Sequence, residues 1–174
     1  RGSDPNAAVY YLARMLDGGE DPLFIARRLC ILAAEDVGLA NPNALLLANS
    51  CFQIVHNIGM PEARIPLAEV TIYLASSPKS NSAYMAINEA LETSKTTQTA
   101  SVPLYLRNAP TKLMDQLGYG DGYKYAHEYP GHFVDLEFMP SGLEGRKFYE
   151  PGENKQEEGL RSRLEALWPK YYGK

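Results

Sequence analysis

The sequence predicts an all-α fold, a bundle of about five to seven helices. Two observations lead to it. Apolar residues recur at helical spacing through the first hundred residues, and three of these stripes follow an Asp-Pro or Asn-Pro pair. The chain has 174 residues, of which 45% are hydrophobic and 22% charged, as in an ordinary globular domain. This length is typical of one domain.

Three helix starts share one pattern. Asp4-Pro5, Asp21-Pro22 and Asn41-Pro42 each place a side chain that can accept a free backbone N–H before a proline at the first helical position. Proline fits there because it has no N–H to leave unpaired. The apolar stripes that follow are Val9, Leu12, Ala13 and Leu16; then Ala26, Leu29, Cys30, Ala33 and Val37; then Ala44, Leu47, Ala48, Cys51, Val55 and Ile58.

Glycines mark the expected ends of these helices. Gly18-Gly19, Gly38 and Gly59 each follow a stripe, where a left-handed cap is favoured. The second and third helices are apolar around more than one face. We therefore expect them to be central in the bundle or to contact another subunit.

Two further helices are expected before residue 95. One starts near Pro66 and ends near Ser76, and the other runs from about Ser80 to Ser94. Their apolar faces carry Leu67, Val70, Tyr73 and Leu74 in the first, and Tyr84, Ile87 and Leu91 in the second.

The character of the chain changes after residue 95. We expect one domain over 1–174, with a helical core (1–95), a loop-rich segment (96–150) and a tail (151–174). The Thr-rich stretch from Lys95 to Ser101 is predicted to be a loop, and Thr111 to Leu117 a short helix. The long ordered loop region predicts a functional or interfacial role. In the tail, Gly152 to Gly159 is predicted to be mobile. A last helix is expected from Leu160 to Tyr172, with Leu164, Leu167 and Trp168 facing inward.

Composition restricts the classes of function. The net charge is −4 and no block is strongly basic, which argues against nucleic-acid binding by overall charge but leaves a local patch open. The longest apolar runs, such as Leu29 to Ala34, are far shorter than the roughly 20 residues of a membrane span. We expect no membrane association and see no secretory leader. Cys30 and Cys51 lie in apolar stretches and are expected to be buried, reduced thiols.

The sequence lacks the common catalytic motifs. Three segments resemble such motifs but lack a feature that the chemistry requires. There is no P-loop, GxSxG elbow or Cys-His zinc pattern. His127 and His132 are five residues apart, and Pro130-Gly131 prevents the helix that a metalloprotease motif requires. Gly118 to Gly122 neither follows a strand nor opens a helix, so it indicates a turn. A triad of His127 or His132 with Asp135 lacks a recognisable nucleophile.

A weak anion-binding signal lies at the expected start of the fifth helix. Lys79, Ser80 and Asn81 follow Ser77-Pro78, where free N–H groups and the helix dipole favour negative charge. Ordinary helix capping explains the same residues. A nucleic-acid phosphate or an acidic partner side chain is the functional alternative.

A second weak signal is a cluster of tyrosines with interspersed cations. Tyrosine bodies with nearby positive charge suit base stacking on a single strand, and equally suit packing or a subunit interface. The residues are Tyr119, Tyr123, Tyr125 and Tyr129, with Arg107, Lys112 and Lys124.

Glu35-Asp36 is an anomaly in a predicted last helical turn. Two acids there oppose the helix dipole. We expect them to pair with Arg27, Arg28 or a neighbouring subunit, or to remain solvated.

Several long segments of the chain are distinctive, and the most specific run extends from Leu106 to Phe133. The segments are Ser3–Ala8, Tyr10–Leu16, Asp21–Leu29, Glu35–Ala40, Pro78–Asn81, Leu106–Met114, Gly118–Gly120, Gly122–His127 and Tyr129–Phe133, with Arg146, Phe148-Tyr149 and Pro151. Together they resemble the C-terminal part of the replication-associated recombination protein A family (RarA, also called MgsA), and the resemblance extends from Arg1 to about Trp168.

The resemblance implies a role that the residues alone do not show. This family consists of AAA+ ATPases related to clamp loaders, which act at stalled replication forks and in recombination. It implies binding to DNA ends or single-strand junctions and cooperation with single-stranded-DNA-binding protein. It also implies a cytoplasmic, nucleoid-associated location. The ATP and Mg²⁺ site belongs to an N-terminal domain whose motifs have no counterpart here. The chain is therefore expected to be a fragment without a catalytic, cofactor or metal site, and its helical region to resemble the clamp-loader collar that joins four subunits.

Three hypotheses follow. The first is a non-catalytic assembly domain, with Tyr119, Tyr123, Tyr125 and Tyr129 as possible interface residues. The second is a DNA- or partner-binding module whose contacts are Lys79, Ser80, Asn81, Arg107, Lys112 and Lys124. The third, an enzyme using His127 and His132, predicts bound metal or hydrolysis, and we expect neither.

Overall fold

The computed structural model describes residues 1–97 and 100–173. These residues form helices and turns and contain no strand, which confirms the all-α prediction. The chain divides into two compact units. The helical unit comprises residues 1–88 with 149–160, and the loop-rich unit comprises residues 89–148 with 161–174.

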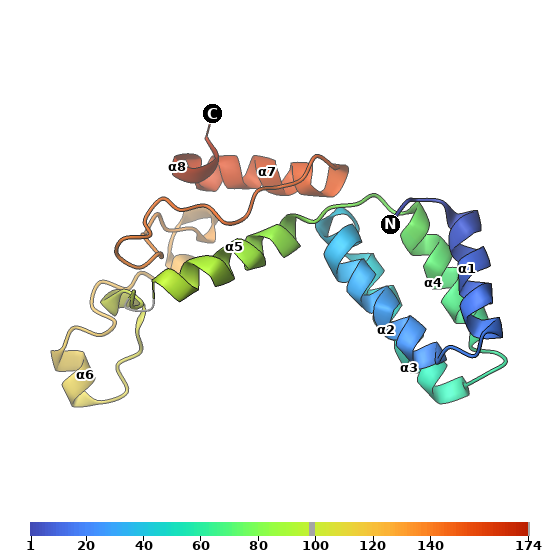
Figure 1. Cartoon of the computed structure of the whole chain (residues 1–174). Helices are drawn as coiled ribbons and strands as arrows, with labels where there is room; N and C mark the ends of the chain where they lie inside the picture. The colour runs from blue at the N-terminus through green and yellow to red at the C-terminus, as the bar shows by residue number, and fades with distance from the viewer. Residues whose placement is uncertain (98–99, 174) are drawn as a thin grey trace. The chain divides into compact units, whose positions relative to one another are not determined.

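The helical unit is built from four helices around one apolar core. They are α1 (Pro5–Asp17), α2 (Pro22–Leu32), α3 (Asn43–Ile58) and α4 (Arg64–Ser76). Helix α4 packs against the other three (Figure 1). The largest apolar side chains with no exposed surface, Leu67 and Leu74, both come from α4. The predicted inner face of this helix is therefore confirmed, although the helix starts two residues before Pro66.

The first two helix starts are capped as the sequence predicts. An Asp4 carboxylate oxygen accepts the N–H groups of Asn6 and Ala7 at 2.9 and 3.1 Å, and Asp21 accepts that of Leu23 at 3.0 Å. Pro5 and Pro22 occupy the first helical positions. Local sequence alone therefore accounts for where α1 and α2 begin.

Asn41 does not cap α3, so this part of the prediction is wrong. Pro42 already has helical dihedral angles and occupies the cap position, with no side-chain capping bond. The Asn41 side-chain amide instead donates to the Tyr73 hydroxyl at 2.8 Å and to Ser77 Oγ at 3.2 Å. These partners lie at the end of α4. A tertiary contact that satisfies half-buried polar groups has replaced the local cap.

Helix α2 continues into a π-helical turn, η1 (Ala33–Val37), and a 3₁₀ turn, η2 (Gly38–Ala40). Glu35 and Asp36 lie in the π-helical turn and both bind Arg1, at 2.8 and 3.0 Å. The acids therefore find a cation, but not Arg27 or Arg28 as predicted, because the start of the chain lies beside this turn. Gly38 has a φ of +49°, and a Cβ there would lie 2.6 Å from the Ser80 carbonyl oxygen. Only glycine fits this approach.

Positive φ values are found at Gly19 and Gly59 as well, but not at Gly18, whose φ is −74°. Of the predicted pair Gly18-Gly19, only the second residue is left-handed. The two thiols, Cys30 and Cys51, are free. Burial raises the pKa of Cys51 to about 11, with smaller contributions from Cys30 and Glu69, so this thiol stays protonated.

Two longer helices, α5 (Ser82–Thr96) and α7 (Lys155–Leu167), have residues in both units. The loop-rich unit also contains η3 (Leu104–Leu106), α6 (Lys112–Gln116), η4 (Ala126–Glu128), η5 (Pro130–His132) and α8 (Pro169–Tyr172). Helix α6 confirms the predicted short helix, which Thr111 caps by accepting the N–H of Met114. Of the predicted Thr-rich loop, Lys95 and Thr96 are helical, and residues 98 and 99 lie outside the described part.

The prediction for the tail is partly wrong. Helix α7 starts at Lys155, inside the stretch predicted to be mobile, and Glu157 in its first turn has no exposed surface. Polar composition led to the prediction of mobility, but hydrogen bonds from Ser82, Tyr149 and Asn154 hold the buried Glu157 carboxylate in place. The last helix also divides, since α7 ends at Leu167 and Pro169 opens α8. Leu164, Leu167 and Trp168 are half-buried.

Candidate functional site

The predicted anion site before α5 is occupied by a carboxylate of the chain itself. Ser82, the first residue of α5, donates its hydroxyl to Glu157 Oε1 at 2.5 Å, and Tyr149 donates to the same oxygen at 3.0 Å. Asn154 Nδ2 donates to Glu157 Oε2 at 2.6 Å. A negative charge therefore does sit at this helix start, as the dipole favours, but it belongs to the start of α7.

The electrostatics of Glu157 follow from these bonds. Burial by itself raises the pKa of this carboxyl group, but hydrogen bonds from Ser80, Ser82, Gly152 and Asn154 outweigh it and lower the pKa to about 2. The group is thus a buried carboxylate at neutral pH. A Cβ on Gly152 would lie 2.7 Å from Glu157 Oε2 and 2.9 Å from Ser80 Oγ, so any larger residue there would displace side chains of this network.

Glu157 was not among the residues predicted from the sequence, although the sequence around it contains a signal. Asn154 accepts the backbone N–H of Glu157 at 3.0 Å, so Asn154-Lys155-Gln156-Glu157 forms a variant of the capping box, with Asn and Glu three residues apart. That spacing marks the start of α7. It does not show that the same carboxylate also binds the start of α5.

The other predicted residues at this site differ in their surroundings. Ser80 Oγ accepts the N–H of Ser82 at 3.3 Å and is part of the Glu157 network. Lys79 Nζ donates to Ser3 Oγ at 2.8 Å and to the Ser77 carbonyl at 3.2 Å. Asn81 is exposed. Contact of these residues with a phosphate stays a prediction.

The structure brings together Arg107 and Tyr119 of the predicted tyrosine cluster. The Arg107 guanidinium lies 5.2 Å from the Tyr119 ring centroid, donates to the Tyr119 hydroxyl at 3.2 Å and to the Val102 carbonyl at 2.7 Å. A pocket of about 350 Å³ lies beside it, lined by Tyr105, Leu106, Arg107, Asn108, Ala109, Gly120 and Tyr123. Arg107 is thus held in place at the wall of this pocket.

The remaining tyrosines and lysines are on the surface. Tyr123, Tyr125 and Tyr129 are exposed, as are Lys112 and Lys124. The two histidines form part of a row of rings, since Tyr125 lies 5.1 Å from His127 and His127 lies 4.8 Å from His132, between centroids. Within residues 1–97 and 100–173, no group of three or more His, Cys, Asp or Glu side chains is arranged to hold a metal ion.

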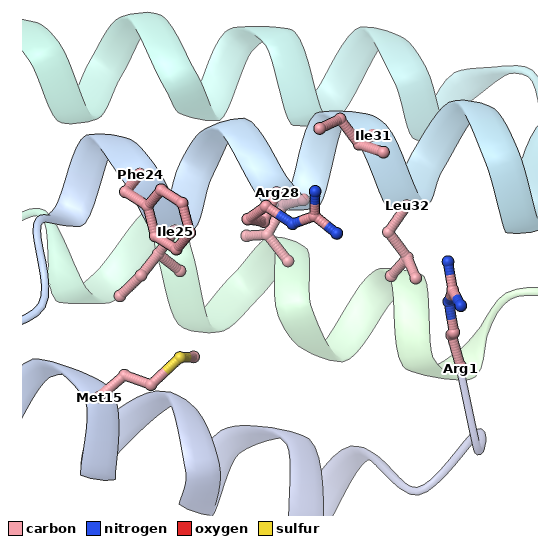
Figure 2. Close-up of a pocket in the computed structure, with 8 residues that line it drawn as sticks. Arg1, Met15, Phe24, Ile25, Arg28, Ile31 and Leu32 are labelled. Atoms are coloured by element: carbon pink, nitrogen blue, oxygen red, sulfur yellow. The ribbon is translucent and has the colours of Figure 1, made fainter.

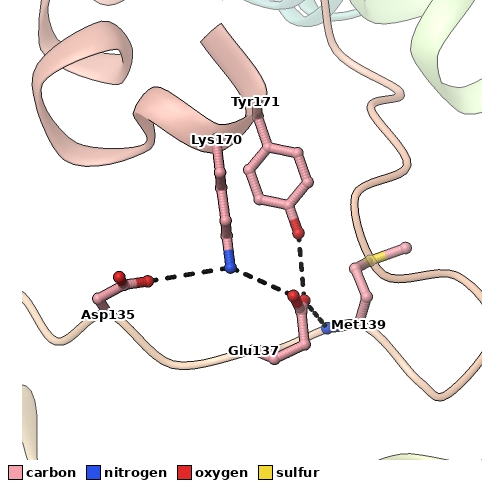
Figure 3. A network of polar contacts seen from close by, with 5 residues as sticks. All are labelled: Asp135, Glu137, Met139, Lys170 and Tyr171. Atoms are coloured by element: carbon pink, nitrogen blue, oxygen red, sulfur yellow. Dashed lines mark hydrogen bonds and ion pairs between the residues drawn. The ribbon is translucent and has the colours of Figure 1, made fainter. Parts of the chain in front are cut away.

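A polar network attaches α8 to the loop at residues 135–139 (Figure 3). Lys170 Nζ lies 3.2 Å from Glu137 Oε2 and 3.9 Å from Asp135, and the Tyr171 hydroxyl donates to Glu137 Oε1 at 3.1 Å. The backbone N–H of Met139 contributes most to lowering the pKa of Glu137, and the bonds from Lys170 and Tyr171 lower it further against the effect of burial. These contacts form a structural clasp between α8 and the loop at residues 135–139.

Comparison with known proteins gives consistent matches. A family model described as "MgsA AAA+ ATPase C terminal" matches residues 2–168. An uncharacterized protein of Thermotoga maritima is 48% identical over 173 residues, which is 99% of this chain and 28% of that protein. Proteins named Replication-associated recombination protein A are similar too. That of Coxiella burnetii is 44% identical over 95% of this chain and 38% of its own length, and that of Bacillus subtilis 43% identical over 98% and 39%.

The helical fold and these matches define a class, the C-terminal domain of an AAA+ ATPase. The chain belongs to the MgsA family, whose named relatives are the replication-associated recombination proteins A. It spans between 28% and 39% of the length of the three relatives described. Over the described residues, no helix has both the length and the apolar character needed to cross a bilayer.

Proposed function

We propose that this chain is the assembly domain of an AAA+ ATPase that acts in replication-fork maintenance and recombination, and that it joins four subunits. Fixed spacing of the subunits would let the arginine finger of one ATPase module reach the nucleotide bound by the next. ATP and Mg²⁺ would bind to a part of the protein outside this chain, which contributes no catalytic residue. A cytoplasmic, nucleoid-associated location follows from this role.

The observation that carries the proposal is the outer surface of α3. This helix has no Asp, Glu, Lys or Arg in its sixteen residues. Its buried side is filled by Ala44, Ala48, Cys51 and Val55. A second row, here called the α3 stripe, consists of Leu47, Ile54 and Ile58, which are 39%, 44% and 48% exposed.

The α3 stripe has the composition of a subunit interface. Ile54 and Ile58 lie seven and eleven residues after Leu47 in the sequence, so the three side chains share one side of the helix. Depletion of charge with exposed aliphatic side chains is typical of the centre of a permanent contact. Because most soluble oligomers are made of identical subunits, a second copy of this chain is the favoured partner.

The test is the solution mass of the 19.3 kDa chain, by sedimentation equilibrium over a range of concentrations. We expect a mass near four protomers. Ile54→Glu places a charge in the α3 stripe and should yield smaller species. Gln53→Glu is the matched control, because it adds the same charge to an exposed position on another side of α3. A wild-type chain that stays monomeric at high concentration contradicts the assembly role.

A second candidate function, DNA binding, is supported by the pocket at Arg107. A guanidinium held against Tyr119, beside exposed Tyr123, is an arrangement on which a single-stranded base can stack. Lys112 and Lys124 would contact phosphates, and single-stranded-DNA-binding protein would be a partner of the whole ATPase. We expect weak binding of a labelled single-stranded oligonucleotide that decreases steeply with salt. Lys112→Glu with Lys124→Glu should abolish it, and an unchanged affinity would exclude this surface.

A further inference from the structure

A groove of about 280 Å³ in the helical unit is lined by six apolar side chains and two arginines (Figure 2). Helix α2 supplies most of it and Met15 of α1 faces it from the opposite side. Ile25 at the floor is buried, whereas Met15, Phe24 and Ile31 are exposed. The groove is therefore bordered by apolar side chains that face solvent in this chain.

The groove is elongated along α2. Its lining runs from Phe24 to Leu32, which corresponds to about 12 Å along a helix axis. The lining residues of α2 recur at helical spacing, so they present one continuous side of that helix. A groove of this kind accepts the apolar face of another helix, with side chains one or two turns apart as anchors. Met15 is a suitable wall because its unbranched side chain adapts to irregular shapes.

The two charged side chains among the lining residues, Arg1 and Arg28, are both arginines, although the whole chain has a net charge of −4. Helix α2 contains Arg27 and Arg28 and no acidic residue. The Arg27 guanidinium lies 5.3 Å from the centroid of Phe24. Arg1, at one end of the groove, already forms ion pairs with Glu35 and Asp36. Arg28 lies midway along the groove and is exposed, and within the described residues no ion pair involves it.

We propose that this groove binds an acidic amphipathic helix of a partner protein. A carboxylate of that helix pairs with Arg28, and its apolar side chains enter between Met15 and α2. The occupant is distinct from the subunit that we assign to the α3 stripe, since that surface carries no charge. The two surfaces are therefore separable by experiment, and the groove does not depend on the assembly role.

The test is fluorescence anisotropy with a labelled twelve-residue peptide in which glutamates occupy one helical face and leucines the other. A second peptide with lysine in place of glutamate is the probe control. We expect Arg28→Glu to weaken binding of the acidic peptide about tenfold or more, because it replaces attraction with repulsion. Arg163→Glu is the matched protein control, an exposed arginine of α7 with the same change of charge, and should alter affinity less than about twofold.

The position of the bound peptide is tested by photo-cross-linking, with a benzophenone in place of one leucine of the peptide. The expected cross-link is to Met15 or to a neighbouring side chain of the groove. Equal binding of the lysine peptide, or a cross-link outside the groove, overturns the proposal. A change in solution mass for Arg28→Glu would also overturn it, because the groove would then be a contact between copies. A change in mass for Ile54→Glu alone leaves the proposal intact.

Discussion

The two units of this chain are stabilised in different ways. All of the buried apolar side chains within the described residues lie in the helical unit, from Leu12 to Ala75. In the described part of the loop-rich unit, the only buried residue is Thr93. Its order comes from glycine turns, hydrogen bonds and ring contacts, such as those of Trp168 with Phe133, Phe138 and Tyr171 at 5.1 to 5.9 Å between centroids.

This difference predicts which of the two units should unfold first. Removing apolar surface from water is the main favourable contribution to folding, and it is concentrated in the helical unit. Regions with few buried apolar contacts unfold locally at lower free energy. The loop-rich unit carries the tyrosines and lysines of the proposed DNA contact, so a partner there would bind to the less stable part. Four predictions test this comparison, in order of decreasing effect.

The largest effect is expected in the core of the helical unit. Leu67→Ala removes a side chain with no exposed surface and leaves a cavity, at a cost of about 3 kcal/mol in the free energy of unfolding. Denaturant unfolding followed by circular dichroism measures this cost. Ile65→Ala on the same helix is the control, because Ile65 is 60% exposed and its loss should cost less than about 1 kcal/mol. Equal effects of the two changes would contradict the assigned core.

The next effect concerns Glu157, whose pKa is lowered from 4.5 to about 2. Because the folded state favours the charged form, this contribution is fully present above pH 4.5 and is lost as the pH falls toward 2. The shift corresponds to about 3 kcal/mol at most. Glu157→Gln should remove it and flatten the pH dependence of stability in that interval, measured by unfolding at several pH values. An unchanged slope would contradict the buried carboxylate.

A smaller effect is expected in the loop-rich unit, where the single tryptophan, Trp168, is a local reporter. Its fluorescence should report unfolding at a lower denaturant concentration than circular dichroism, since two separate transitions are expected. Phe133→Ala removes an edge contact with Trp168 and should lower only the midpoint denaturant concentration of the fluorescence transition. The loss in the free energy of unfolding of this unit should be about 1 kcal/mol. Coincident transitions in the wild type would show that the units unfold together.

The smallest effect is expected at the clasp of Figure 3. The pKa of Glu137 is lowered chiefly by the N–H of Met139, so the clasp contributes above the ordinary carboxyl pKa and weakens as the pH falls below it. Glu137→Gln should lower the Trp168 fluorescence midpoint less than Phe133→Ala does, because Glu137 and Lys170 are partly exposed. The variant should also reduce the decrease of this midpoint as the pH falls below the ordinary carboxyl pKa. A larger effect than that of Phe133→Ala would show that polar contacts dominate in this unit.

Much of the fold could be predicted because it depends on neighbouring residues. Asp4 and Asp21 cap the helices that follow, and the period of apolar residues identified which side of α4 is buried. The family resemblance was likewise readable, because it rests on long ordered motifs. The candidate sites were harder to predict from the sequence. Lys79, Ser80 and Asn81 were predicted as possible anion contacts, but the sequence did not indicate that Ser82 binds the carboxylate of Glu157, which lies 75 residues away.

The sequence by itself therefore determined the helical class, the helix starts with local caps and the family of this chain. Only the tertiary structure decided which polar groups are buried together. Asn41 binds Tyr73 in preference to its own helix, Arg1 binds the acids of the π-helical turn, and Glu157 joins the starts of two helices. The physical reason is that capping and periodicity act within a few residues. Burial of a polar group, in contrast, is stable only where distant parts of the chain bring donors and acceptors into contact.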